Sequence, residues 1–529
     1  MLLLRYIWIG LLLAGCCLPP VHGCYDMYLS PKWYLCIGSV LLWLANESIL
    51  LLRGKHCFYV EWSYLLKGLT VCSAFAVVYA VCMFCCQRQM LFSGPYDNPA
   101  GLAFCVSVPL TFGAERLMQS HGRQRWILAG VLLLAVLIIC CTHSRTGVLA
   151  VLLTFFINVL KQSRERVKRI VSVAFIIVCV ACVTALSVQK TDSTNGRSFI
   201  IGRTFELIAR HPFTGSGAGG FRRQYMDVQA NYFAMHPHSR FAELADDVSH
   251  PLCEFLQVWT DYGFIGLLLF FCVLFVPFVY YSIRPPSSSC SLCGLSVPVV
   301  VFSCFSYPFH YPEAWLVLFL AWIPVLRNMK RGKYHAYAVC HHRGVGGLSC
   351  VFFLVAFLLL LRQWAFDYEW DRIARESLRG HSREMMPRYR ALYQHKSSDA
   401  LFLYNYAMEQ FYAGEWEPSS RTAETCSQLM SSYDLELLRG DIFRSCGQYS
   451  KALRHYKRAR WMCPVRFAPL GGMLMVYAVD GQDDAGEKMA QEILDKRVKV
   501  PSPMVRHIRM QAKDYLDRHA RNHRRKQAE

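Results

Sequence analysis

Charged residues are scarce in this chain of 529 residues: only 18% are Asp, Glu, Lys or Arg, whereas 54% are hydrophobic. The mean hydropathy is +0.23. Soluble domains carry about 25% charged residues, so this composition excludes a chain that is soluble throughout. The sequence predicts an integral membrane protein.

Acidic residues are fewer than basic residues, with 37 Asp and Glu against 57 Lys and Arg. Short loops rich in Lys and Arg stay on the cytoplasmic side of a membrane, so the excess reflects topology and does not argue for a nucleic-acid partner. The loops expected on the cytoplasmic side are 53–61, 118–125, 161–169 and 327–343. The opposite face then receives 19–32, 87–98, the turn at Ser144, 189–260, 310–313 and everything after Arg362.

Apolar runs near the roughly 20 residues that cross a bilayer occur about eleven times before residue 362. They lie at 2–18, 33–52, 64–86, 99–117, 126–142, 146–160, 170–188, 262–282, 295–309, 314–326 and 347–361. We therefore expect an all-α fold in which a polytopic transmembrane bundle, residues 1–361, precedes a soluble helical domain.

A disulfide framework and a metal centre are both missing from the sequence. Many of the 24 cysteines lie inside apolar runs, where Cys behaves as a small hydrophobic residue. Cys290 and Cys293 form a single C-x-x-C without a second pair, which does not predict a metal site. Near the N-terminus, residues 13–16 match a lipoprotein cleavage box ending at Cys16 and equally the end of a first span.

The segment after the last apolar run is polar and has helical periodicity. Three glycines, Gly414, Gly447 and Gly481, are 33 and 34 residues apart, and a small residue follows each by five positions. This spacing resembles the tetratricopeptide repeat, in which the glycine ends the first helix and the small residue lets the second helix approach it. We expect a linker at 362–395, repeats at 396–519 and a basic tail at 520–529. Such repeats bind a protein partner, position a neighbouring domain or form a packing lid on the membrane domain.

The longest polar stretch between apolar runs is 189–260, and long structured loops are where function concentrates. Several short motifs lie in this stretch or at other segments of the predicted outer face: Asn98-Pro-Ala-Gly-Leu-Ala, Ser144-Arg145-Thr-Gly147, Gly196-Arg197, His-Pro-Phe-Thr-Gly-Ser-Gly at 211–217, His250, and Gly263-Phe-Ile-Gly266. Taken in this order over roughly 94–280, they resemble the O-antigen ligase and polymerase superfamily.

That resemblance implies a helical enzyme of the bacterial inner membrane with its C-terminal domain in the periplasm. The family takes a glycan from undecaprenyl diphosphate on the periplasmic face and joins it to an acceptor hydroxyl, without metal or other cofactor. Many relatives carry a His-Asn pair that would fall at Leu252 and Cys253, whereas this chain has His250 followed by a proline. His250 is the candidate catalytic base, with Glu254 and His238 as alternatives.

The chemistry of the reaction gives a separate reason for these residue types. Guanidinium groups form bidentate, charge-assisted bonds to phosphate oxygens, so we assign the donor diphosphate to Arg145 and Arg197, with Arg203 in reserve. A histidine with an ordinary pKa near 6.5 can accept the acceptor hydroxyl proton at neutral pH. Attack opposite the diphosphate would invert the anomeric carbon.

Each candidate residue also has a structural alternative. Arg145 could anchor a helix end at the membrane interface, and His250 could lie beside a helix cap. Glu47, inside the second predicted span, is either a helix contact or part of a substrate groove. Gly215, Gly217 and Gly220 satisfy G-x-G-x-x-G, but no βαβ unit surrounds them, so we expect a tight turn rather than a dinucleotide site.

The acceptor separates three versions of the reaction: lipid A core for a ligase, another glycan for a polymerase, and a Ser or Thr side chain for a protein O-oligosaccharyltransferase. The ligase ranks first, and the repeats mildly favour a protein acceptor because such repeats bind polypeptides. A transporter or flippase that uses Glu47 and the arginines for an anionic lipid-linked substrate is the alternative class. Internal duplication would favour a transporter, and we find none in the sequence.

Overall fold

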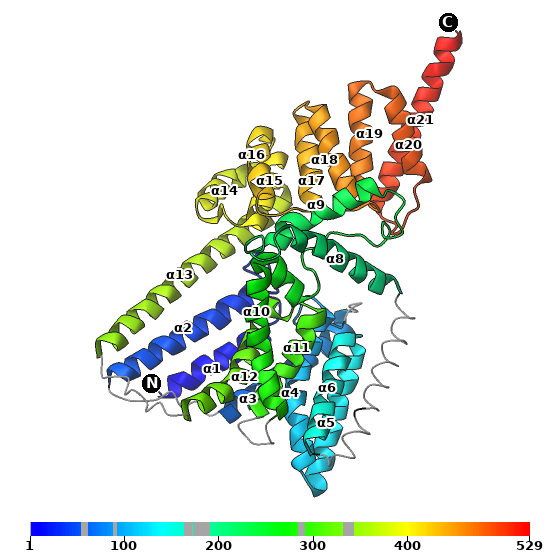
Figure 1. Ribbon diagram of the computed structural model, residues 1–529. Helices are drawn as coiled ribbons and strands as arrows, with labels where there is room; N and C mark the ends of the chain where they lie inside the picture. The colour runs from blue at the N-terminus through cyan, green and yellow to red at the C-terminus, as the bar shows by residue number, and fades with distance from the viewer. Residues whose placement is uncertain are drawn as a thin grey trace. The chain divides into compact units, whose positions relative to one another are not determined.

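The computed structural model of the chain describes residues 2–53, 62–87, 92–162, 172, 191–283, 291–331 and 343–528. Within these residues the protein is helical without a strand, which confirms the all-α prediction (Figure 1). The helices up to α12 are α1 (Leu2–Cys16), α2 (Ser30–Leu52), α3 (Trp62–Gln87), α4 (Pro99–Gln119), α5 (Gly122–Cys141), α6 (Arg145–Gln162), α8 (Thr191–Arg210), α9 (Gly220–Met235), α10 (Glu254–Ile283), η1 (Ser291–Leu295), α11 (Ser296–Phe305), η2 (Pro308–His310) and α12 (Pro312–Arg331). The remainder are α13 (Arg343–Glu376), η3 (Ser377–His381), α14 (Ser382–Lys396), α15 (Ala400–Tyr412), α16 (Trp416–Ser427), α17 (Tyr433–Ser445), α18 (Tyr449–Met462), α19 (Ala468–Asp480), α20 (Asp483–Asp495) and α21 (Pro503–Ala528).

The chain forms two compact units, each built from segments that are distant in the sequence. The membrane unit consists of Met1–Gln189, Leu252–Phe255 and Leu267–Arg372. The repeat unit consists of Lys190–Pro251, Leu256–Gly266 and Ile373–Glu529. The long loop between two predicted spans therefore belongs to the same compact unit as the C-terminal helices.

Five helices among the described residues are long and apolar enough to cross a membrane, which supports a multi-pass membrane protein. They are Ser30–Leu52, Leu65–Cys86, Gly122–Cys141, Glu254–Ile283 and Gly346–Lys396. Shorter apolar helices occupy other predicted spans, among them Leu4–Cys16 and Pro312–Leu326. The predicted span 170–188 lies, except for residue 172, outside the described residues, so the number of eleven spans stays a prediction.

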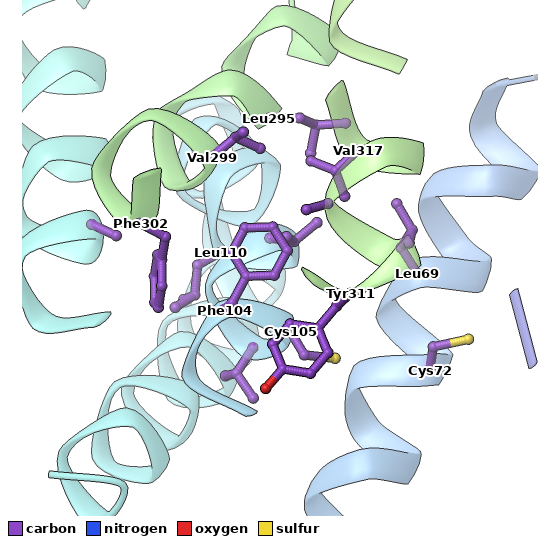
Figure 2. Close-up of a cluster of buried hydrophobic side chains, with 14 of the residues drawn as sticks. Leu69, Cys72, Phe104, Cys105, Leu110, Leu295, Val299, Phe302, Tyr311 and Val317 are labelled. Atoms are coloured by element: carbon purple, nitrogen blue, oxygen red, sulfur yellow. The ribbon is translucent and has the colours of Figure 1, made fainter. Parts of the chain in front are cut away.

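The core of the membrane unit surrounds α4, whose residues 101–108 are all buried. Figure 2 shows Phe104 and Leu110 of α4 packed among Phe302 of α11, Val317 of α12 and Leu69 of α3. By contrast, most apolar side chains of α5 are exposed, as expected for a helix whose apolar surface faces lipid. Within the described residues of the membrane unit, α4 is thus enclosed over most of its length, whereas α5 is peripheral.

Glu47 is a helix contact within the membrane unit. Arg5 of α1 forms a bidentate pair with its carboxylate, with Nε and one terminal nitrogen each 2.6 Å from a carboxylate oxygen. Both side chains are buried, and the Trp43 indole N–H donates a further bond at 3.1 Å. Pairing satisfies the two charges where water is absent. This geometry favours the structural alternative for Glu47 over a substrate groove.

The C-terminal helices of the repeat unit form successive hairpins: α15 with α16, α17 with α18, and α19 with α20 (Figure 1). Gly414, Gly447 and Gly481 lie in the three hairpin turns with positive φ, as the spacing predicts. Two of the small residues that follow them, Ser419 and Ala452, are fully buried. The hairpins are therefore present, and their assignment to the tetratricopeptide family stays a prediction.

Helix α9 of the long loop packs on the same hairpins. Phe221 and Tyr225 of α9 are buried in one cluster with Tyr433 at the start of α17 and Met462 at the end of α18. Asp227, further along α9, accepts bonds from the Ser431 hydroxyl at 2.8 Å and from Arg458. The loop thus covers the end of this hairpin that lies opposite its turn.

Candidate active site

One end of the membrane unit gathers polar side chains that lie in or next to three segments predicted on the outer face. The Trp33 indole N–H donates to the carbonyl oxygen of His310 at 3.1 Å. The Asn98 amide donates to the hydroxyl groups of Tyr307 and Tyr311 at 2.8 and 3.0 Å. These bonds bring the three segments together at one end of the bundle, as a shared side of the membrane requires.

Arg145 is the first residue of α6, and the turn before it explains why the helix begins there. The Ser144 hydroxyl accepts a bond from the Gly147 N–H at 3.2 Å and caps the helix. Gly147 packs against α4, since a Cβ added to it would lie 3.0 Å from the Cβ of Ala103. Arg145 therefore lies at the end of the bundle where Asn98 caps α4. The first turn of a helix favours negative charge, which suits a residue that binds phosphate.

Glu254 lies at the same end of the membrane unit. It is buried at the start of α10, and its carboxylate accepts a bond from the Phe309 N–H at 3.1 Å. Phe309 belongs to η2, the short helix between Tyr307 and Tyr311. Glu254 therefore adjoins the segment that carries Tyr307 and Tyr311.

Two unusual backbone conformations flank the candidate residues. In the described part of the chain, the non-glycine residues with positive φ are His143, at 52°, and Leu252, at 57°. Left-handed backbone costs a non-glycine residue roughly 1–2 kcal/mol. Such strain concentrates at functional sites. His143 precedes Arg145 by two positions, and Leu252 follows His250 by two.

In the repeat unit, the segment 212–217 closes a break in α10 at Gly263. We call this segment and the break together the helix clasp. Backbone groups of α10 that would bond to each other in an unbroken helix bond to residues 212–217 instead. The Phe264 N–H donates to the Pro212 carbonyl oxygen at 2.9 Å. The Ser216 and Gly217 N–H groups donate to the carbonyl oxygens of Thr260 and Asp261, each at 2.8 Å. The clasp therefore satisfies the polar backbone groups that the break exposes.

Two glycines allow this close approach. Gly263 has φ 67° and ψ −168°, and a Cβ added to it would lie 2.1 Å from the carbonyl oxygen of Phe213. A Cβ added to Gly215 would lie 2.4 Å from the carbonyl oxygen of Asp261. Both distances are shorter than any real contact, so only glycine fits at these positions.

Asp261 is a residue whose role sequence reasoning missed. Its buried carboxylate accepts bonds from the N–H groups of Gly219 at 3.1 Å and Phe221 at 3.0 Å, at the start of α9. The N-cap position of α9 is Gly219, which has no side chain to cap the helix, and Asp261 supplies that cap from a distant part of the chain. The Gln257 amide also donates to Asp261 at 3.0 Å and orients it.

The backbone N–H groups of the three glycines in the G-x-G-x-x-G string all bond within the protein. The N–H groups of Gly215, Gly217 and Gly220 donate to carbonyl oxygens of the protein. A dinucleotide or phosphate loop needs such N–H groups to face the ligand. The string is therefore a tight turn, as predicted.

His250 is half-buried and follows a segment that the rest of the repeat unit fixes in place. The fully buried Gln229 of α9 donates to the carbonyl oxygens of Asp246 at 3.0 Å and Met462 at 2.7 Å. Arg466 pairs with the Asp246 carboxylate at 2.7 Å. The chain is thus tied to α9 and to the hairpins four residues before His250.

The remaining candidates differ in their surroundings. Arg197 lies exposed on α8. Arg203 pairs with Glu206 at 2.5 Å and lies over the Tyr232 ring at 4.3 Å, so its side chain serves packing within the repeat unit. His238 is exposed in the turn after α9. Among the described residues, no group of three or more His, Cys, Asp or Glu side chains has an arrangement that could hold a metal ion.

Comparison with known proteins bears on this arrangement. Residues 130–271 match the profile of a protein family described as O-antigen ligase. This match supports the O-antigen ligase superfamily for residues 130–271. No curated protein matches the chain.

The O-antigen ligase match begins within α5 and ends within α10. It therefore includes both strained turns, the helix clasp and the candidates Arg145, Arg197, Arg203, His238, His250 and Glu254. The family indicates a membrane glycosyltransferase of the ligase or polymerase type. The hairpins of the repeat unit lie outside the match.

Proposed function

We propose that this protein transfers a glycan from undecaprenyl diphosphate to an acceptor hydroxyl on the periplasmic face of the bacterial inner membrane, as an O-antigen ligase. The observation that carries the proposal is the family match over residues 130–271, within which the two strained non-glycine turns adjoin Arg145 and His250. Strain next to charged and titratable side chains is more typical of function than of packing.

The donor needs its diphosphate charge bound before the glycosidic bond can break. Arg145 lies at a helix start, where the helix dipole adds to its own charge. Arg197 is exposed on α8. Both arginines keep their charge at any relevant pH and form bidentate bonds to phosphate oxygens. Arg203, which pairs with Glu206, stays in reserve.

The acceptor needs its hydroxyl proton removed as it attacks. In this scheme His250 accepts that proton, and the acceptor oxygen forms a bond to the anomeric carbon from the face opposite the diphosphate. The bond from that carbon to the diphosphate oxygen breaks, and undecaprenyl diphosphate leaves with the electron pair. Proton transfer of this kind contributes typically about 10²- to 10⁴-fold in rate. Glu254 and His238 are the alternative bases.

Two structural facts bear on the competing functions. Arg5 pairs with the Glu47 carboxylate, which argues against a transporter that would use this carboxylate to bind its substrate. The hairpins contact the loop that carries His250. Positioning this loop gives them a role that does not require a protein acceptor. Lipid A core is accordingly our first choice of acceptor, followed by another glycan and a protein side chain.

The test is an analysis of envelope glycans in a strain that lacks this protein, with and without the wild-type chain restored. Loss of lipopolysaccharide ladders together with accumulated lipid-linked glycan supports the ligase. Shortened chains indicate a polymerase, and a missing glycoprotein indicates the protein-directed enzyme. Unchanged glycans in all three fractions would contradict the proposal.

A further inference from the structure

Exposed aromatic side chains gather around the helix clasp in the repeat unit. Phe213 is 69% exposed, and Tyr262 and Phe264, on either side of the helix break, are 54% and 48% exposed. Phe205 on α8 is 48% exposed. Large apolar side chains left open on one surface usually mark an interaction site.

The contacts of the clasp hold these side chains together. The Pro212 carbonyl oxygen accepts bonds from the Phe264 N–H at 2.9 Å and from the Trp259 indole N–H at 3.0 Å. Phe213, the next residue, is therefore fixed beside the break in α10. The Phe205 ring meets the Trp259 ring edge-on, with centroids 6.1 Å apart. One surface thus carries the aromatic side chains of α8, the clasp and the start of the helix after the break.

The helix after the break has the dimensions of a membrane span. Residues 264–283 cover about 30 Å at roughly 1.5 Å per residue. The hydrocarbon core of a bilayer is about 30 Å thick. Glu254–Ile283 is one of the candidate spans, and its charged residues, Glu254 and Asp261, precede the break. The membrane boundary on this side therefore falls near Gly263.

From this boundary we infer that Phe205, Phe213 and Tyr262 enter the lipid surface and anchor the loop to the bilayer. The occupant of the exposed patch is lipid because the first residues after the break, Phe264 and Ile265, are themselves exposed and begin the span. Aromatic rings prefer the boundary between hydrocarbon and headgroups. The exposed side chain of Arg210, close to Phe213 in sequence, suits the headgroup layer.

Lipid photo-crosslinking tests this anchor. Benzoylphenylalanine replaces one aromatic residue at a time in the full-length protein, which is reconstituted in vesicles of phosphatidylethanolamine and phosphatidylglycerol and irradiated. Phe205, Phe213 and Tyr262 are the test positions, and Phe264 is the positive control. Tyr412, 67% exposed at the end of α15, is the matched negative control. Mass spectrometry of the tryptic peptides then counts lipid and protein adducts.

The anchor predicts lipid adducts at Phe205, Phe213 and Tyr262 in yields comparable to that at Phe264, and none at Tyr412. Each replacement keeps an aromatic ring, so folding is preserved. Lipid adducts at Phe264 alone would overturn the inference. Adducts between Phe213 and another part of the protein would also overturn it, because they would identify a protein surface as the occupant.

Discussion

The Phe264 N–H donates to the Pro212 carbonyl oxygen at 2.9 Å, and this bond joins the start of a predicted membrane span to the loop between α8 and α9. In an unbroken helix the same N–H would bond to the residue four positions earlier. Here the Thr260 carbonyl oxygen accepts a bond from the Ser216 N–H instead. The broken helix and the glycine-rich loop complete each other, which gives a physical reason for finding both motifs in one family domain.

Alanine at Gly263 or Gly215 should open the helix clasp. The added Cβ would collide with backbone atoms at 2.1 and 2.4 Å, and both residues have positive φ. We expect a loss of stability at the upper end of the roughly 0.5–3 kcal/mol range of single substitutions. Glycan transfer should fall with it. Amide hydrogen exchange of residues 212–221 measures the opening.

Gly202→Ala is the control for these variants. Gly202 lies within α8, where a Cβ would meet nothing within 4 Å. Alanine is favoured over glycine in a helix by about 1 kcal/mol, so this variant should be unchanged or slightly more stable. Normal exchange in the Gly263→Ala protein would show that the clasp is not needed.

Arg466→Ala should loosen the segment that leads to His250. The guanidinium pairs with Asp246 at 2.7 Å and is 41% exposed, so the pair contributes about 1 kcal/mol or less. We expect faster hydrogen exchange over 246–250 and up to about a fivefold loss of transfer, since about 1.4 kcal/mol corresponds to a factor of ten. Arg421→Ala, which removes an exposed pair on α16, is the control. Equal effects of the two substitutions would argue against a positioning role.

Glu47→Gln should destabilise the membrane unit, because Arg5 would remain buried without its charge partner. Breaking a buried pair costs about 3–5 kcal/mol. The double variant Arg5→Met with Glu47→Leu should recover most of this stability and retain transfer. Thermal unfolding in detergent and a transfer assay measure the two effects. A stable double variant that has lost transfer would assign Glu47 to the substrate groove.

The α17–α18 hairpin should lose stability in acid. Burial alone would raise the pKa of the Glu436 carboxyl, but bonds from His455 at 2.8 Å and Arg439 at 3.1 Å lower this pKa below its ordinary value. A lowered pKa in the folded state stabilises the fold above the ordinary Glu pKa, and this stability is lost as pH falls through the folded value.

Hydrogen exchange of the α17 and α18 amides at pH 7 and below pH 4, corrected for the intrinsic rate, measures this loss. Wild-type protein should lose protection in acid, and Glu436→Gln should show a smaller difference between the two conditions. An equal loss in both proteins would mean that another group controls the acid response.

Local signals predicted much of this structure, whereas contacts between distant segments could not be predicted. Gly447 and Ala452 identify a hairpin because its geometry depends on nearby residues. The helix start at Arg145 follows in the same way from Ser144. The clasp is different. Position 263 must be glycine because the carbonyl oxygen of Phe213 approaches it closely, and no sequence periodicity indicates that these two residues meet. The cap that Asp261 gives to α9 is also a contact between distant segments. The sequence did hold one sign of it, because α9 begins at glycines, which have no side chain to cap the helix.

The most direct test of the catalytic assignment is the amount of undecaprenyl-diphosphate-linked glycan in cells that carry Arg145→Ala or His250→Ala in place of the wild-type chain. His211→Ala, which changes an exposed histidine at the end of α8, is the control. We predict that both variants are present in the membrane at wild-type level, accumulate the lipid-linked glycan as the deletion strain does, and leave the acceptor unmodified, while the control behaves as wild type. Wild-type glycan transfer in the Arg145→Ala and His250→Ala strains would contradict the assignment.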